Sequence, residues 1–248
     1  MSLAIVKSIS LQGLEGILIN VEVDISSGMP SWEVVGLPDV SIRESKERVR
    51  TAIKNCGIEV LSRKYIINLS PANIKKEGSL LDLTIAIGIL RSMDIVKQDL
   101  LENTVIVGEL SLDGKINKVN GILPITIEAL KYGIKRIIVP KENAKEAAII
   151  NDIEVIGVSN LREVIKYLNK EITIEKEKVN IEDILKNDYC KKVDFSEVKG
   201  QEMIKRALEI SAAGGHNCLM IGCPRFRQNY DGKKVTFNFT GFNFRRIS

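Results

Sequence analysis

The amino-acid sequence predicts a mixed α/β protein (an α+β mixed sheet) over most of its 248 residues. Short runs in which apolar and polar residues alternate are typical of strands, and longer runs with a spacing of three and four residues are typical of helices. Some neighbouring strands are joined by short turns and others by helices, which indicates both hairpins and βαβ units. With 44% hydrophobic and 27% charged residues, the chain can bury a core in one large domain or two smaller ones.

The first part of the chain is expected to contain four strands and two helices. A helix near 41–56 is predicted to begin at a capping box formed by Ser41 and Glu44 and to end at Gly57. The segment 80–92 is apolar on almost every side, which indicates a buried helix, and Ser79 is interpreted as its N-cap. The strands are expected near 3–10, 15–25, 31–36 and 65–69, with a loop at 70–78.

The second part continues with shorter elements. Strands are predicted near 104–111 and 115–118, joined by a turn at Asp113-Gly114. Residues 171–193 alternate charges with sparse apolar positions and are interpreted as a linker with one short helix at Ile181–Asn187. The remaining elements are helices near 122–132, 141–150 and 160–168 and strands near 136–139 and 153–156.

Composition narrows the classes of function. The four cysteines form no CxxC pair and His216 is the only histidine, so no metal site and no disulfide framework is predicted. His216 itself is interpreted as a turn residue. The first residues lack the apolar core of a signal peptide, and no apolar run is long enough to span a membrane, which favours a cytoplasmic location.

The segment "DFSEVKGQEMIKRALEISAAGGHNCLMIG" (194–222) resembles the start of the AAA+ module in magnesium-chelatase-like ATPases of the YifB/ComM type. Its periodicity predicts a helix over 201–213, ended by two glycines, and a strand at 217–221. The resemblance implies ATP and Mg²⁺ as cofactors, a homo-oligomeric ring, and work on DNA in recombination or competence for intact relatives. It also implies a remnant nucleotide site at Val198, Lys199, Gly200, Gln201, Gly222 and Pro224.

The last segment, 225–248, departs from that family. It holds six basic residues, one acid and five of the six phenylalanines, which is compatible either with a nucleic-acid-binding tail or with a stretch read out of frame. Back-translation with allowed codons, shifted by one base, yields Gly-Ser-Gly-Lys-Thr-Met-Met-Ala-Lys, the missing half of a phosphate loop. We therefore expect a frameshift after Pro224, a truncated ATPase module at 194–224 and a disordered tail.

Two segments resemble the proteolytic domain of Lon: "KKEGSLLDL" (75–83) and the run 107–143, which begins "VGELSLDGKINKVNG". That chemistry needs a serine nucleophile activated by a lysine. In the matching positions stand Leu80 and Leu123, so the resemblance implies a non-catalytic Lon-like domain at 1–170. The alternative, a Ser–Lys peptidase, would need a register slip onto Ser79, and even that supplies no lysine at the base position.

The helix expected near 41–56 is rich in cations, which could face nucleic acid. Glu44 and Glu47 lie among them, so an ordinary solvated face is the favoured interpretation. Trp32, the only tryptophan, is expected in the core. The cations of the helix are Arg43, Lys46, Arg48, Arg50 and Lys54.

Overall fold

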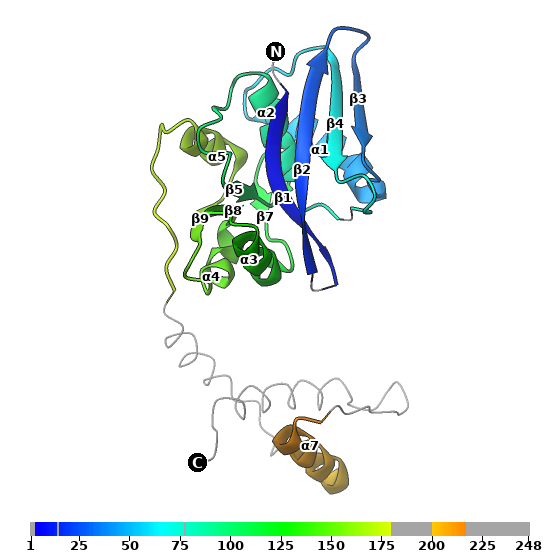
Figure 1. Ribbon diagram of the computed structural model, residues 1–248, viewed down its shortest axis with the longest axis vertical. Helices are drawn as coiled ribbons and strands as arrows, with labels where there is room; N and C mark the ends of the chain where they lie inside the picture. Colours follow the sequence, from blue (N-terminus) through cyan, green and yellow to red (C-terminus); the bar gives the residue numbers. More distant parts are fainter. Residues whose placement is uncertain (1–2, 14, 77, 180–199, 217–248) are drawn as a thin grey trace. The chain divides into compact units, whose positions relative to one another are not determined.

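The computed structural model describes residues 3–13, 15–76, 78–179 and 200–216 (Figure 1). The chain divides into two compact units, Met1–Asn180 and Ile181–Ser248. The expected helix Ile181–Asn187, the expected strand 217–221 and the tail 225–248 lie outside the described residues. Within the described part, no helix is both long enough and apolar enough to cross a membrane.

The first unit is built on a mixed seven-stranded sheet with the order β3-β4-β2-β1-β5-β8-β9. The pairs β1–β2 and β2–β4 are antiparallel, and the other four pairs are parallel. A separate two-stranded sheet consists of β6 (Glu109–Leu110) and β7 (Ile116–Asn117). The strands of the large sheet are β1 (Ala4–Gln12), β2 (Glu15–Ser26), β3 (Ser31–Val35), β4 (Lys64–Ser70), β5 (Thr104–Ile106), β8 (Arg136–Pro140) and β9 (Glu154–Val158).

Helices cover the sheet unequally. The row Ile106, Ile138 and Ile156 joins the larger core cluster, which also contains the buried residues of α1 (Val40–Asn55), α2 (Asp82–Ser92) and α5 (Leu161–Leu168). The adjacent row, which includes Val105 and Ile137, joins a smaller cluster with α3 (Ile122–Lys131) and α4 (Ala144–Ala147). Because neighbouring strand residues point to opposite faces, the parallel half of the sheet is buried on both sides (Figure 1).

The apolar segment near 80–92 forms α2, as predicted, and every residue of this helix except Arg91 is buried. It packs on β1 and β2, and Gly88 permits the close approach: a Cβ there would lie 2.8 Å from Cγ2 of Val23. The helix is buried on all sides because α1 covers its outer surface.

The helix predicted near 41–56 forms α1, but its predicted cap is wrong. Asp39, not Ser41, is its N-cap, and the Asp39 carboxylate accepts a hydrogen bond from the Ile42 N–H at 2.8 Å. Ser41 lies inside the first turn, and its carbonyl oxygen accepts a hydrogen bond from Arg48. An aspartate one turn before the apolar positions is as good a cap as serine, and the tertiary contact of its second oxygen decides between them.

Two other elements are shorter than expected. The strand predicted over 104–111 is interrupted at 107–108, so β5 stays in the large sheet and β6 leaves it. The helix predicted over 141–150 is reduced to a 3₁₀ turn, Lys141–Asn143, and the four residues of α4. Asn143 is fully buried there, and its side chain bonds both the N–H and the C=O of Val119 at 2.9 Å.

The chain after α5 returns along the sheet. The Glu177 N–H donates to the Val155 carbonyl oxygen at 3.0 Å, so this segment lies against the outer side of β9. Ile174 packs on the larger core cluster and Val179 on the smaller one.

The described part of the second unit is one helix, α7 (Glu202–Gly214). It ends as the sequence predicts: Gly215 is the C-cap in the left-handed region with φ of 63°. The His216 N–H donates to the Ser211 carbonyl at 2.9 Å, and the Ser211 hydroxyl donates to the His216 carbonyl at 2.7 Å. His216 is therefore a turn residue that closes the helix.

Candidate functional site

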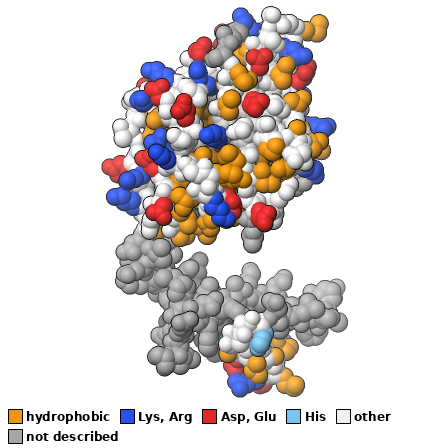
Figure 2. All heavy atoms as spheres, viewed as in Figure 1, with side chains coloured by type: hydrophobic (Ala, Val, Ile, Leu, Met, Phe, Trp, Pro, Cys, Tyr) orange, Lys and Arg blue, Asp and Glu red, His pale blue; other side chains and the backbone are white. Residues whose placement is uncertain are grey.

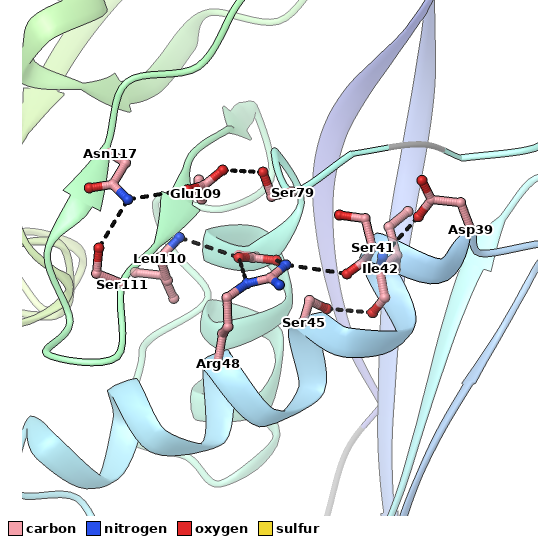
Figure 3. A network of polar contacts seen from close by, with 11 residues as sticks. Asp39, Ser41, Ile42, Ser45, Arg48, Ser79, Glu109, Leu110, Ser111 and Asn117 are labelled. Atoms are coloured by element: carbon pink, nitrogen blue, oxygen red, sulfur yellow. Dashed lines mark hydrogen bonds and ion pairs between the residues drawn. The ribbon is translucent and has the colours of Figure 1, made fainter.

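Ser79, one residue before the position that the Lon resemblance assigns to the nucleophile, lies just before α2 and faces Glu109 of β6 (Figure 3). The Ser79 hydroxyl donates to one oxygen of the Glu109 carboxylate, and the other oxygen accepts from the Asn117 amide at 3.2 Å. Asn117 also donates to the Ser111 hydroxyl at 2.9 Å. The interpretation of Ser79 as the N-cap of α2 is wrong, because α2 has no side-chain cap and the Ser79 hydroxyl is bound to Glu109 instead.

The two leucines to which the Lon resemblance assigns the dyad positions make structural contacts. Leu80 packs against both core clusters, and its carbonyl accepts from the Gly108 N–H at 2.9 Å. Leu123 lies in the first turn of α3, after Gly121, and its N–H donates to Glu146 at 3.3 Å. Neither side chain can ionise or attack. Lys118 is exposed, and no hydrogen bond or ion pair joins it to Ser79 in the described residues.

Beside the cluster of Ser79, Glu109 and Asn117 lies an ion pair between α1 and α2 whose carboxylate is buried. The Arg48 guanidinium contacts the Asp82 carboxylate with both Nε, at 2.8 Å, and Nη2, at 3.1 Å. The Asp82 side chain is 1% exposed. Burial raises the pKa of Asp82, and the hydrogen bond and charge of Arg48 offset only part of that rise. The same hydrogen bond raises the pKa of Arg48, which stays protonated.

The loop before Ser79 is fixed by Asp39 and Lys76. One Asp39 oxygen caps α1 and the other accepts from the Gly78 N–H at 3.1 Å, so a single carboxylate joins a helix end to this loop. Lys76 is fully buried, and its ammonium donates to the carbonyl of Gly36 at 2.9 Å and to that of Pro71. Burial lowers the pKa of Lys76.

This arrangement can hold a serine hydroxyl still, but it does not provide a Ser–Lys dyad. Glu109 accepts the hydrogen bond of the Ser79 hydroxyl. A carboxylate is, however, too weak a base to activate a serine hydroxyl as a nucleophile on its own. The buried amine of Lys76 is directed to backbone carbonyls and joins two loops. The site is thus a set of polar links between α1, α2 and β6.

Two of the predicted nucleotide-site residues are described. Gly200 and Gln201 both lie in the left-handed region, with φ of 69° and 61°. Gln201 is the residue before α7, and its carbonyl accepts from the N–H groups of Ile204 and Lys205, each at 3.0 Å. A left-handed glutamine is uncommon and marks a tight turn into the helix. The other four, Val198, Lys199, Gly222 and Pro224, lie outside the described residues.

The partners of the site were harder to predict than its position. Asp39, Asp82 and Glu109 were not singled out, because each acts on a residue about 30 or more positions away. One signal was present in the sequence: Asp82 is the single acid in a segment apolar on every side, and a carboxylate in such a segment needs a buried partner.

Comparison with known proteins connects both units to one family. The family model for subunit ChlI of Mg-chelatase matches residues 21–143, and a second model, magnesium chelatase subunit ChlI, matches residues 194–228. YifB of Escherichia coli is 40% identical over 226 residues, which are 90% of this chain and 43% of YifB. The competence protein ComM of Haemophilus influenzae is 36% identical over 225 residues, 90% of this chain and 44% of ComM.

Two more distant relatives match parts of the chain. Lon protease 2 of Bacillus subtilis is 28% identical over 169 residues, 60% of this chain and 30% of that protease. The DNA repair protein RadA of Halalkalibacterium halodurans is 30% identical over 113 residues, 46% of this chain and 24% of RadA. The first of these agrees with a Lon-like α/β fold for the N-terminal unit.

The chain spans less than half the length of YifB and ComM. Within that span, the similarity covers nine tenths of its residues and includes both the α/β unit and the segment around α7. The chain therefore belongs to the magnesium-chelatase ChlI-like AAA+ family of the YifB/ComM type.

Proposed function

We propose that this chain is the N-terminal part of a cytoplasmic, ATP-driven remodelling protein of the YifB/ComM type that works on DNA. In this proposal, residues 1–170 are a non-catalytic Lon-like domain, 171–193 a linker whose described part, up to residue 179, packs on that domain, 194–224 the start of the ATPase module and 225–248 an out-of-frame tail. The complete protein would use ATP and Mg²⁺ and assemble as a homo-oligomeric ring. The name of RadA, a DNA repair protein, supports the association with DNA.

The observation that carries the non-catalytic role of the first unit is the pair Leu80 and Leu123. Both leucines pack or bond as structural residues, and the Ser79 hydroxyl is engaged by Glu109. A Ser-directed fluorophosphonate tests this directly, with the Ser79→Ala variant as its control. We expect no labelling that depends on Ser79. Stoichiometric labelling of wild type that is absent from Ser79→Ala would establish the peptidase alternative.

We further propose that the chain as written neither binds ATP tightly nor hydrolyses it. A phosphate loop holds nucleotide through backbone N–H groups of a glycine-rich turn, a lysine, and a Ser or Thr on Mg²⁺. The chain instead has Arg225, Phe226 and Arg227 in the turn and Gln228 in the lysine position. This donor set does not fit ATP with Mg²⁺, so no catalytic step is assigned to it.

Calorimetric titration with ATP tests this proposal. The 248-residue chain is compared with the product of a gene from which one base near codon 225 is removed. We expect micromolar binding only for the corrected protein, because only that frame encodes the lysine and threonine. Micromolar binding by the uncorrected chain would refute the proposal.

A further inference from the structure

An open cavity of about 170 Å³ lies between the exposed side of α1 and the β3–β4 edge of the sheet. Its wall contains one aromatic ring, Trp32 of β3. It also contains three cations, Lys46 and Arg50 of α1 and Arg63 just before β4. Glu47 is the one acid in the lining. The cavity is therefore net positive and has one aromatic side chain.

The cationic lining continues along α1. Arg43, Lys46, Arg50 and Lys54 follow each other at intervals of three and four residues, which places them on one side of a helix. In the described part of the chain, none of the four makes a hydrogen bond or an ion pair through its side chain. From the first to the last, the helix rises about 16 Å, which is the length of several phosphates along a nucleic-acid strand. We call these four residues the α1 basic stripe.

The basic stripe differs from the rest of the first unit. On the side shown in Figure 2, Lys and Arg side chains are interspersed with Asp and Glu, and hydrophobic side chains lie between them. The exposed lysines of the pairs Lys131–Glu128 and Lys170–Asp99 have acidic partners, whereas the four cations of the stripe have none in the described residues. A row of four cations without such partners produces a local positive potential that suits a polyanion.

Trp32 is held as a rigid platform beside the centre of the stripe, where Lys46 and Arg50 also line the cavity. It packs on the larger core cluster, and its ring centroid lies 5.0 Å from that of Tyr65, with the planes tilted by 41°. Tyr65 is fully buried and cannot move aside. The Trp32 side chain also lines the cavity. An aromatic ring already ordered by packing can stack on a base with little further loss of side-chain freedom.

We propose that the α1 basic stripe and the Trp32 cavity bind single-stranded nucleic acid, with phosphates along α1 and one base against Trp32. A single strand fits better than a duplex, because only unpaired bases expose a face that can reach the indole. The proposal rests on the DNA association proposed above and specifies where in the N-terminal unit the strand is bound.

Trp32 is the only tryptophan in the chain, so its fluorescence reports on this cavity alone. The experiment titrates the full chain with an oligothymidine, without nucleotide, and follows tryptophan emission. We expect saturable quenching with a dissociation constant of about 10⁻⁴ to 10⁻⁶ M, weakening linearly with the logarithm of salt concentration. Binding through the basic tail 225–248 would not depend on Lys46 or Arg50, so variants on α1 distinguish the two.

Two charge-reversal variants separate this site from general attraction. Lys46→Glu with Arg50→Glu removes the centre of the stripe. Lys141→Glu with Lys145→Glu makes the same change in net charge at two exposed positions on the other side of the sheet. We expect the first pair to weaken binding about tenfold or more and to lower the salt slope by about two. The second pair should stay within about twofold of wild type, both pairs keeping the wild-type thermal midpoint.

Three results would overturn the proposal: an absence of saturable quenching, an equal loss of affinity in both variants, or quenching by a duplex at lower concentrations than by the single strand. Because ATP takes no part in this titration, such a failure leaves the proposed ATPase identity to be judged by the calorimetric experiment alone.

Discussion

Arg48 and Arg50 lie two residues apart in α1 and face opposite surroundings. Arg48 points to α2, where its guanidinium contacts Asp82 through two nitrogens, and its side chain is 27% exposed. Arg50 is exposed and lines the open cavity beside Trp32. The same residue type therefore pairs with a buried carboxylate in one case and lines an open surface cavity in the other.

The difference shows how α1 divides its charges. The face toward α2 carries one cation, matched to one buried carboxylate, and the outer face carries four cations without ion-pair partners in the described residues, together with Glu44 and Glu47. A buried charge without its partner is costly, whereas an exposed charge is solvated by water. Substitution should therefore affect stability on the inner face and ligand binding on the outer face.

The largest expected effect comes from breaking the inner pair. Arg48→Met leaves the Asp82 carboxylate buried without a counter-charge, so we expect the free energy of unfolding to fall by about 3 kcal/mol. Arg50→Met is the matched control and should change it by no more than about 0.5 kcal/mol. Urea denaturation of the two variants measures the difference. Similar losses in both would show that the two arginines are equivalent.

A double variant sharpens the interpretation of this loss. When Asp82→Leu accompanies Arg48→Met, no charge remains buried, and an apolar pair can fill the space between the helices. We expect at least half of the lost stability to return, because replacing both members of a buried pair is often neutral. A double variant as unstable as Arg48→Met alone would indicate that α1 and α2 need the hydrogen bonds and not only charge balance.

The next effect is a dependence of this loss on pH. Burial raises the pKa of Asp82 above its ordinary value of 3.8, so the folded chain binds this proton more tightly than the unfolded chain. The stability that this group contributes is therefore greatest in acid and falls as the pH rises from 3.8 through the folded pKa. Arg48→Met removes the interaction that lowers the pKa, which extends this window to higher pH.

Urea denaturation of wild type and Arg48→Met at about pH 4.5 and pH 7 measures the shift. The deficit of the variant should be smaller at the acid pH, where Asp82 takes up a proton in the folded state. Adding Asp82→Asn to Arg48→Met is the control and should remove this dependence. A deficit of equal size at both pH values would contradict the assignment to Asp82.

The smallest expected effect concerns the polar cluster. Ser79→Ala removes one hydrogen bond to Glu109, which keeps its bond from Asn117, so the free energy of unfolding should fall by about 1 kcal/mol or less. Ser27→Ala, at an exposed turn, should have no measurable effect. A loss above about 3 kcal/mol would assign Ser79 a far larger part in holding α2 than one hydrogen bond provides.

The sequence predicts the elements whose cause is local. The apolar segment of α2 and the glycine end of α7 are confirmed, because periodicity and a left-handed glycine act within a few residues. The short α4 was not predicted, because the buried Asn143 takes its partners from Val119, 24 residues earlier. The sequence pattern over 141–150 is helical, but the hydrogen bonds between Asn143 and Val119 hold the start of this segment in a 3₁₀ turn instead.

The candidate site follows the same division. The assignment of the dyad positions to Leu80 and Leu123 rests on local motifs and stays a prediction, whereas the cationic side of α1 could be found from the spacing of its residues. The choice between Ser41 and Asp39 as the cap of α1 could not, because the second oxygen of Asp39 is bound by Gly78, 39 residues later. The aromatic part of the cavity was also hidden, since β3 meets α1 only in the folded chain.

The backbone hydrogen bond from Glu177 to Val155 bears on where the chain can be truncated without exposing the edge of the sheet. β9 is the last strand of the sheet, so the backbone after α5 covers an edge that would otherwise offer free N–H and C=O groups to another molecule. We expect a domain truncated at residue 170, just after the last helix of the unit, to lose this cover and to associate with its own copies by pairing at the edge of β9. A domain that ends at residue 179 keeps the cover and should remain monomeric.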